Sequence, residues 1–380
     1  MRILVSGGGT GGHIYPALAV ARALQERHGA ELLFLGDANG LETRIVPQAG
    51  VPFVSITAGK LRRYLSLGTI TDLGRIPVGM AQALRHVGRF RPHAAFTSGG
   101  YVSVPAGVAA RLHGAPLLMH QQDLSPNLAN RLLTPVATRI SVSFPASVAY
   151  FPKGKTSLAG NPVREPMLAM MGADPAALKA RLGFDPHLPL LLVTGGSQGA
   201  RHLNQVVAGA LPYILPRCQV LHVSGQLTYD ETRAQAAERL ASAPTGGHMA
   251  ARYQLHAYLD DPMPAALAAS DIVLCRSGAS TLAELALLAK PSLLVPLPPG
   301  FSGSPQLANA QMFAQAGAAT IVLDRDLTVE RLAAALPPLL GDPARLAAMG
   351  AAARAFARPD AAATLADAVA ALAARRARGR

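Results

Sequence analysis

The sequence contains no tryptophan and few aromatic residues of any kind. Phe and Tyr together make up 5% of its 380 residues, and they are not interleaved with basic side chains. Such interleaving is typical of proteins that stack nucleic-acid bases on their surface. The net charge of +13 still suits an anionic partner. We therefore expect that partner to be a membrane face or a phosphorylated substrate, and we expect no nucleic acid.

Cysteine and long apolar runs are also scarce. Cys218 and Cys275 are the only cysteines, too few for a disulfide framework or a metal cluster, and both lie in apolar runs that predict burial. No uncharged apolar run reaches the length of a bilayer span, and the first run passes straight into glycines without a signal-peptide core. We expect a cytoplasmic protein that is at most peripheral to a membrane.

Half of the residues are hydrophobic and 15% are charged, which indicates a globular chain long enough for two domains. Strand-like and helical patterns alternate, which predicts an α/β fold with parallel sheets covered by helices on both faces. Prolines and a glycine at residues 159–166 predict a domain boundary. We expect an N-terminal domain over 1–160, a second over 161–342, and terminal helices over 343–380 that pack back on the first. The expected strands are 31–35, 94–97, 116–119, 139–142, 219–223, 271–275 and 291–296, and the expected helices are 16–28, 76–89, 281–289 and 307–316.

Two glycine-rich turns follow apolar runs, at residues 7–12 and at residues 195–200. Each is typical of a strand that feeds a helix through a loop whose N–H groups approach a phosphate. In the first turn Gly7, Gly9 and Gly12 satisfy GxGxxG, and Asp37 ends the next strand where a dinucleotide fold carries its ribose acid. An NAD-dependent oxidoreductase is therefore one hypothesis, and a turn with a structural role alone is another.

Five strings occur together in one order: GGTGGH at 8–13, SGGYVSVPAG at 98–107, GNPVR at 160–164, GGSQGAR at 195–201 and RSGASTLAE at 276–284. In combination they closely resemble the MurG family of UDP-N-acetylglucosamine transferases, over nearly the whole chain. The resemblance implies a GT-B architecture, with two Rossmann-like domains that face each other across a cleft. It also implies an inverting, metal-independent transfer of N-acetylglucosamine to lipid I, forming lipid II in peptidoglycan synthesis. A divergent homologue that binds the sugar nucleotide without catalysis is the alternative.

A donor site on the second domain follows from the residues and from the resemblance. Glu284 lies one helical turn after Thr281, where a carboxylate can accept both hydroxyls of a ribose. Residues 279–281 are small and leave room for backbone contact with uridine and phosphate. The resemblance adds an uracil contact through the backbone of Leu259, and pyrophosphate contacts from Arg164. The expected donor ligands are Arg164, Ser197, Leu259, Ala279, Ser280, Thr281, Leu282, Ala283, Glu284 and Gln306.

His13 closes the first turn and is the main catalytic candidate. A neutral imidazole accepts a proton at cytoplasmic pH, so His13 is predicted to be the general base for the acceptor's 4-hydroxyl. A substrate-orienting role for His13 remains the alternative, and Asp123 is a second candidate that shares the base role and contacts the donor sugar. Thr10, Gly11 and Gly12 are expected to face the acceptor's pyrophosphate and the donor's sugar.

Three residues depart from the pattern of the family. Gln121 replaces a carboxylate, Asp123 replaces an amide, and Pro305 occupies a position that commonly carries a polar side chain. A DxD string at 324–326 precedes Thr328 and Glu330, which favours a turn and a helix cap over a metal site. We expect no cofactor and no metal.

A basic and then apolar stretch predicts contact with anionic lipid on the cytoplasmic face of the membrane. From the sequence alone, the hydrophobic core is the favoured place for most of its apolar side chains. The residues are Lys60, Arg62, Arg63, Tyr64, Leu65, Leu67, Ile70, Leu73, Ile76 and Met80.

Overall fold

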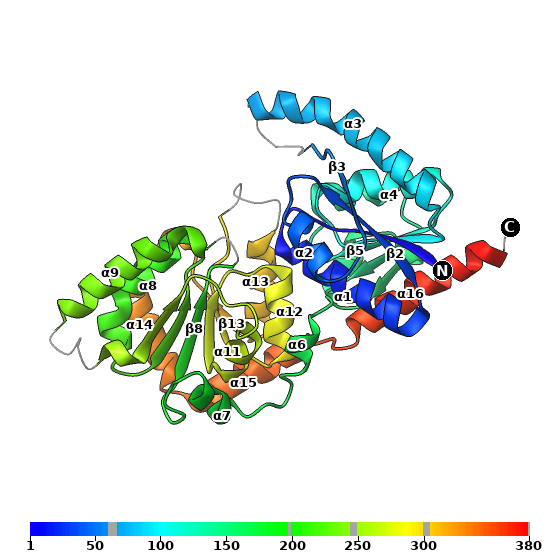
Figure 1. Cartoon of the computed structure of the whole chain (residues 1–380). Helices are drawn as coiled ribbons and strands as arrows, with labels where there is room; N and C mark the ends of the chain where they lie inside the picture. Colours follow the sequence, from blue (N-terminus) through cyan, green and yellow to red (C-terminus); the bar gives the residue numbers. More distant parts are fainter. Residues whose placement is uncertain (60–66, 197–198, 244–248, 299–304, 379–380) are drawn as a thin grey trace. The chain divides into compact units, whose positions relative to one another are not determined.

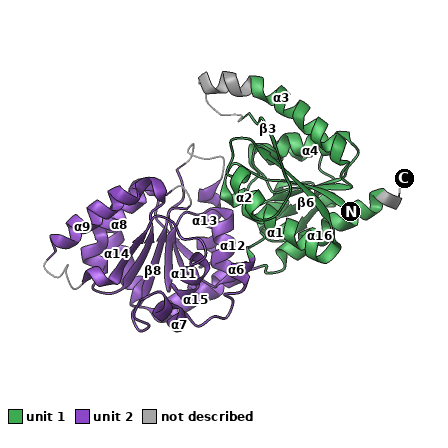
Figure 2. Cartoon of the chain, in the orientation of Figure 1, with its two compact units in different colours: residues 1–164, 358–380 green, residues 165–357 purple. Residues whose placement is uncertain are grey.

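The computed structural model divides the chain into two compact units (Figures 1 and 2). Unit 1 comprises Met1–Arg164 and Arg358–Arg380, and unit 2 comprises Glu165–Ala357. The structure describes residues 1–59, 67–196, 199–243, 249–298 and 305–378, without the side chains of 67–73 and 377–378. Lys60, Arg62, Arg63, Tyr64, Leu65 and Ser197, which the sequence singled out, lie outside the described residues.

Unit 1 contains a parallel sheet in the order β3-β2-β1-β4-β5-β6-β7. Ile3 of β1 pairs with Leu32 on one side and with Ala94 on the other, so β1 and β4 are neighbours at the point where the strand order reverses. Open α/β sheets bind ligands beyond the carboxyl ends of their strands at such a point. The strands are β1 (Arg2–Ser6), β2 (Glu31–Asp37), β3 (Phe53–Ile56), β4 (Ala94–Thr97), β5 (Leu117–Gln121), β6 (Arg139–Val142) and β7 (Thr156–Leu158).

Helices cover both faces of this sheet because successive strand residues point to opposite sides. Ile3 and Val5 pack in one buried cluster with residues of α1 and α16, whereas Leu4 packs in another with residues of α3 and α4. The helices are α1 (Gly11–His28), α2 (Glu42–Gln48), α3 (Leu67–Phe90), α4 (Ser103–Leu112), α5 (Leu128–Leu133) and α16 (Ala361–Arg378), with short 3-10 turns at Pro145–Tyr150 and Lys153–Lys155.

Unit 2 repeats the arrangement with the strand order β10-β9-β8-β11-β12-β13, which reverses between β8 and β11. The strands are β8 (Leu190–Thr194), β9 (Gln219–Val223), β10 (Tyr253–His256), β11 (Ile272–Cys275), β12 (Ser292–Leu294) and β13 (Ala319–Ile321). The helices are α6 (Glu165–Leu168), α7 (Pro175–Arg181), α8 (Arg201–Ile214), α9 (Tyr229–Ala241), α11 (Met263–Ala269), α12 (Ala279–Leu287), α13 (Gln306–Gln315), α14 (Val329–Leu340) and α15 (Pro343–Arg354), with 3-10 turns at Gln226–Thr228, Ala250–Arg252 and Asp324–Asp326. The expected α/β fold with two parallel sheets is confirmed.

The tail of the chain is shared between the units, which corrects the expectation that all of 343–380 packs on the first. Met349 of α15 belongs to the core of unit 2, Arg354 Nη1 donates to Leu287 O at 2.7 Å, and Phe356 stacks on Phe313. Only α16 lies in unit 1, where its apolar face packs against α1. The alanine-rich composition predicted helices, but the partner of each helix depends on its few larger side chains.

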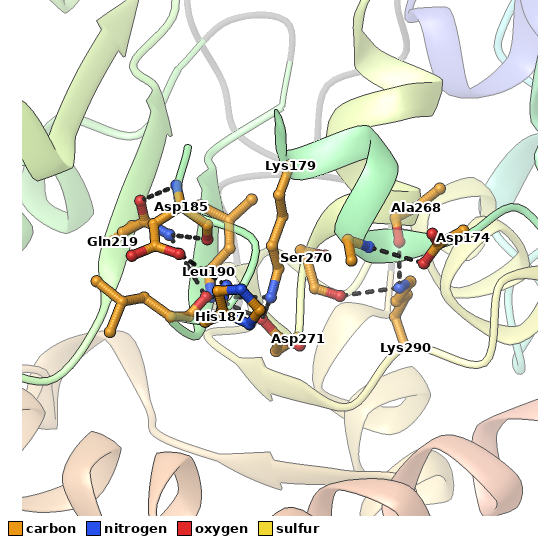
Figure 3. Close-up of polar contacts among 12 residues, drawn as sticks. Asp174, Lys179, Asp185, His187, Leu190, Gln219, Ala268, Ser270, Asp271 and Lys290 are labelled. Carbon is orange, nitrogen blue, oxygen red and sulfur yellow. Dashed lines mark hydrogen bonds and ion pairs between the residues drawn. The ribbon is translucent and has the colours of Figure 1, made fainter. Parts of the chain in front are cut away.

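Two buried lysines hold together the amino-terminal ends of the strands in unit 2 (Figure 3). Lys179 Nζ lies 2.7 Å from Asp271 Oδ2, which also accepts the backbone N–H of Leu190 at 2.7 Å. Lys290 Nζ donates to Ala268 O at 2.6 Å and to Ser270 O at 2.8 Å, at the C-terminus of α11, where a cation is favourable. Burial lowers the pKa of Lys290 to about 8.

Both cysteines are buried, as expected. Burial raises the pKa of each thiol to about 12, so both behave as small apolar groups. Of the helices in the described ranges, none combines the length and the apolar character needed to cross a bilayer.

Candidate functional site

In unit 1 the predicted catalytic residues meet at the reversal point of the sheet. The first glycine turn, residues 7–12, follows β1, Ser98 follows β4, and Asp123 follows β5. The turns after β1 and β4 touch: a Cβ placed on Gly7 would lie 1.9 Å from Ser98 Oγ. His13, the third residue of α1, lies against this contact.

The hydrogen bond of His13 fixes which of its nitrogens carries the proton. Nδ1 lies 3.1 Å from Ser98 O, and a carbonyl oxygen only accepts, so Nδ1 is the donor. Neutral His13 therefore keeps a lone pair on Nε2. Burial lowers the pKa of His13, while the charges of Asp123 and Glu42 oppose that change. The imidazole is consequently neutral near pH 7 and ready to accept a proton.

Ser98 and Gln122 hold His13 in place, and neither role was predicted from the sequence. Ser98 Oγ donates to His13 O at 2.7 Å, and Gln122 Nε2 donates to Ser98 O at 2.8 Å. Gln122 is 4% exposed. In the sequence, only the position of Gln122 next to Asp123 pointed to a role in the site, because the hydrogen bond to Ser98 joins residues 24 positions apart.

Gln121 and Asp123, two of the departures from the family pattern, belong to one buried segment. Gln121 Nε2 donates to Asp123 O and to Ser125 O, each at 2.9 Å. A carboxylate at position 121 has no such donors when it is ionised. The amide at position 121 thus shapes the loop that carries the carboxylate of Asp123. His120, next to Gln121, is fully buried, and burial lowers its pKa to about 4.

Asp37 is not available to a ribose. The side chain is 5% exposed, accepts a hydrogen bond from Tyr101 Oη, and accepts the backbone N–H of Asn39. A ribose would have to displace the tyrosine in order to reach this carboxylate. The burial of Asp37 and its bond to Tyr101 argue against a dinucleotide site at the first turn.

The remaining predicted residues of unit 1 lie around the start of α1. Thr10 is exposed at the N-cap, and Gly11 and Gly12 open the helix. The guanidinium of Arg164 lies 4.8 Å from the ring centroid of Tyr15 on the first turns of α1. This cation–π contact holds a positive charge beside α1.

In unit 2 the described residues of the second glycine turn, 195, 196, 199 and 200, follow β8 at the corresponding reversal point. Gly196 and Gly199 have φ of +86° and +77°, and a Cβ on Gly199 would lie 2.4 Å from Ser224 O. Only glycine fits such a close approach at positive φ. The turn therefore rests directly on the segment that follows β9.

A neutral network supports this second turn from below. Asn204 Nδ2 donates to Ser224 O and Thr228 Oγ1, so its Oδ1 accepts from His222 Nε2, at 3.0 Å. His222 Nδ1 then accepts from Tyr253 Oη, also at 3.0 Å. Burial lowers the pKa of His222 to about 3, so the ring carries no charge.

Helix α12 presents most of the predicted donor residues at its N-terminus. An anion is favourable at this end of the helix, because the positive end of the helix dipole lies there. Glu284, one turn after Ser280, is partly exposed, as are Thr281 and Ala283. Leu282 differs: its side chain is fully buried and its N–H already donates to Gly278 O at 3.0 Å. Leu282 is thus a core residue, and Ala279, 5% exposed, offers mainly its backbone.

The DxD string at Asp324–Asp326 forms a 3-10 turn. Asp324 Oδ1 lies 2.5 Å from Arg276 Nη1, and Asp324 Oδ2 lies 3.3 Å from His202 Nδ1. Thr328 caps α14 by accepting the backbone N–H of Arg331, which confirms the predicted cap. In the parts of the chain that the structure describes, no three His, Cys, Asp or Glu side chains group as metal ligands.

Gln306 lies beside the β11–α12 turn, where Gly278 approaches its Nε2. Its Oε1 accepts the N–H of Leu297 at 3.0 Å, and its own carbonyl accepts from Ser277 Oγ at 2.8 Å. Asn309, which the sequence analysis did not identify, donates to Ser277 O at 3.1 Å. Leu259, partly exposed, follows β10 at the same edge of the sheet.

Residues 3–142 match the glycosyltransferase family 28 N-terminal domain, and residues 190–365 match the glycosyltransferase family 28 C-terminal domain. A UDP-N-acetylglucosamine–N-acetylmuramyl-(pentapeptide) pyrophosphoryl-undecaprenol N-acetylglucosamine transferase from Desulforudis audaxviator is 40% identical, over 94% of this chain and 95% of that protein. The protein of the same name from Exiguobacterium sibiricum is 38% identical, over 97% of each chain. The crystal structure of Acinetobacter baumannii MurG superposes with a TM-score of 0.75, at 28% identity, over 97% of this chain and 99% of that chain.

Proposed function

The chain belongs to glycosyltransferase family 28, and on that premise we propose that it transfers N-acetylglucosamine from UDP-N-acetylglucosamine to lipid I. The acceptor atom is the 4-hydroxyl of the muramoyl sugar, and the product is lipid II. The names of these relatives, which specify this donor sugar and this class of acceptor, support both substrates.

The observation that carries the proposal is the hydrogen bond from His13 Nδ1 to Ser98 O, since it leaves Nε2 as a base. Nε2 accepts the proton of the 4-hydroxyl while that oxygen forms a bond to the anomeric carbon of the donor. The bond from this carbon to the diphosphate breaks, and UDP leaves with the electron pair from the opposite face. A positioned base of this kind accelerates a reaction by about 10²–10⁴-fold. Asp123 stabilises the imidazolium that forms, because its negative charge raises the pKa of His13.

The donor binds on unit 2 in this proposal. Glu284 accepts the ribose hydroxyls, the backbone of Leu259 recognises uracil, and the first N–H groups of α12 together with the second glycine turn face the diphosphate. Gln306 and Asp123 contact the transferred sugar. Ser197, outside the described residues, is a further proposed phosphate ligand. The scheme needs no metal, since helix dipoles, backbone N–H groups and Arg164 stabilise the leaving diphosphate.

The acceptor is held by unit 1, with Thr10, Gly11 and Gly12 facing its pyrophosphate. Lipid I is anchored in a membrane, so the enzyme works as a peripheral protein on the cytoplasmic face. Ile76 and Met80 of α3 are partly exposed and Val78 is 50% exposed, which supports contact of α3 with anionic lipid.

The test is transfer of labelled N-acetylglucosamine to a lipid I analogue by the purified full-length protein. We expect saturable transfer that UDP inhibits competitively against the donor. A protein that binds UDP-N-acetylglucosamine but never transfers the sugar would be the non-catalytic homologue, and the proposal would be rejected.

A further inference from the structure

A carboxylate is buried directly beneath the first glycine turn. Glu42, the first residue of α2, is 0% exposed. Its Oε1 accepts the backbone N–H of Asp37 at 3.0 Å, and its Oε2 accepts the backbone N–H of Gly9 at 3.4 Å. Burial of a carboxylate is unfavourable unless donors compensate it. Here the donors belong to the turn itself and to the end of β2.

Three glycines make room for this side chain. A Cβ on Gly8 would lie 2.2 Å from Glu42 Oε1, one on Gly36 would lie 2.5 Å from its Cγ, and one on Gly40 would lie 2.3 Å from its Cδ. Gly9 has φ of +87° and carries the ring of Tyr101 on its other side, where a Cβ would lie 2.9 Å from Cε1. The turn is thus fixed between the Glu42 carboxylate and the Tyr101 ring.

The Glu42 carboxylate also affects the charge state of His13, the residue that directly follows the turn. The negative charge of Glu42 raises the pKa of His13, against the effect of burial. The other groups that face the imidazole are the Asp123 carboxylate, the Ser98 carbonyl and the neutral ring of His120. Arg164 adds a cation over Tyr15, two residues farther along α1.

We propose that Glu42 is a positioning residue for the transfer reaction: it holds the first glycine turn in the shape that aims His13, and it stabilises the imidazolium formed there. The inference rests on the proposed role of His13 as the base. Glu42 has no exposed surface and therefore acts through the turn and through its charge, without touching substrate.

Glu42→Gln is the first test variant, in the full-length protein. The amide keeps the shape but accepts at one oxygen only, and it carries no charge. We expect kcat to fall about tenfold while KM for UDP-N-acetylglucosamine stays within about twofold. We also expect the acidic limb of the kcat/KM profile to move to lower pH by several tenths of a unit, because the limb reports the pKa of the free enzyme's base. Glu26→Gln, an exposed glutamate of α1, is the matched control and should change neither value.

Glu42→Asp separates shape from charge. The shorter side chain keeps its charge but cannot reach both N–H groups, so kcat should fall while the acidic limb stays near its wild-type position. A wild-type limb in Glu42→Gln, or the same displaced limb in both variants, would contradict the proposal. If Glu42→Gln does not fold, an acidic limb in Glu42→Asp that departs from wild type is sufficient to reject it. Absence of transfer by the wild-type protein would instead reject the proposed function.

Discussion

The two glycine turns occupy equivalent places in the two sheets, yet the polar side chains beneath them differ in charge. Beneath the first turn lies the buried carboxylate of Glu42. Beneath the second lies the neutral pair of Asn204 and His222. Unit 2 buries its lysines at the other end of its strands, around Asp271 (Figure 3).

This difference in charge indicates that the two turns have different functions. A phosphate at Gly8 or Gly9, away from the start of α1, would face the Glu42 carboxylate, whereas a phosphate on the second turn would face neutral groups and helix N-termini. A general base benefits from nearby negative charge, because carboxylates stabilise the protonated form that the base adopts during the reaction. The first turn is therefore suited to His13, and the second to a nucleotide diphosphate.

The largest expected effect is that of His13→Gln. The amide still donates to Ser98 O but has no basic nitrogen, so kcat should fall at least about 100-fold. KM for the donor should change less than about twofold, since the donor is proposed to bind on unit 2. Steady-state kinetics with a lipid I analogue measures both values, with His187→Gln as an exposed control. A near-normal kcat in His13→Gln would show that the general base does not lie at the first turn.

Lys290→Met tests whether burial lowers the pKa of Lys290 in unit 2. The pKa of Lys290 is about 8 in the folded protein, below the value of 10.5 for a free lysine, so the unfolded chain binds the proton more tightly between these values. The free energy of unfolding of the wild type should therefore gain up to about 3 kcal/mol relative to Lys290→Met as pH rises from 8 to 10.5. Urea denaturation at a series of pH values measures this difference. A difference that does not vary with pH would show that Lys290 stays charged throughout.

Glu284→Ala is expected to weaken the donor site itself. Loss of hydrogen bonds to a charged acceptor costs about 2 kcal/mol, which corresponds to a roughly 30-fold increase in the donor's KM. Glu238→Ala, an exposed glutamate on α9, should leave KM unchanged. An equal KM in the two variants would place the ribose elsewhere.

Asp123→Asn should give the smallest effect. Removal of its charge lowers the pKa of His13, so the acidic limb of the kcat/KM profile should move to lower pH by less than about one unit. A pH series on wild type and variant measures the displacement. Loss of activity at every pH, with no displacement, would indicate instead that Asp123 is itself the base.

The strands and helices were predictable because each is buried in a regular pattern. All seven expected strands and all four expected helices are present, and most ends differ by two residues or fewer, but α1 begins five residues and α3 nine residues before the expected starts at 16 and 76. The turns at 7–12 and 195–200 were recognisable because their glycines follow apolar strands. The partner of α15 was not predictable, since Met349 and Arg354 find their contacts in segments far away along the chain.

The candidate site was predictable only where residues lie close together in the sequence. Glu284 and His13 stand in recognisable strings, whereas Gln122, Glu42 and Asn309 act through bonds that span 24, 33 and 32 residues. Leu282 was predicted to be a donor ligand because it lies within the string at 276–284. The geometry of the helix nevertheless directs its side chain into the core. The role of Asp324 likewise depends on Arg276, 48 residues away.

Calorimetric titration of UDP into wild type, His13→Gln and Glu284→Ala tests the division of work between the two turns most directly. We predict wild-type affinity for His13→Gln and an affinity at least tenfold weaker for Glu284→Ala. Weakened binding in His13→Gln together with unchanged binding in Glu284→Ala would place the nucleotide at the first turn and contradict the account.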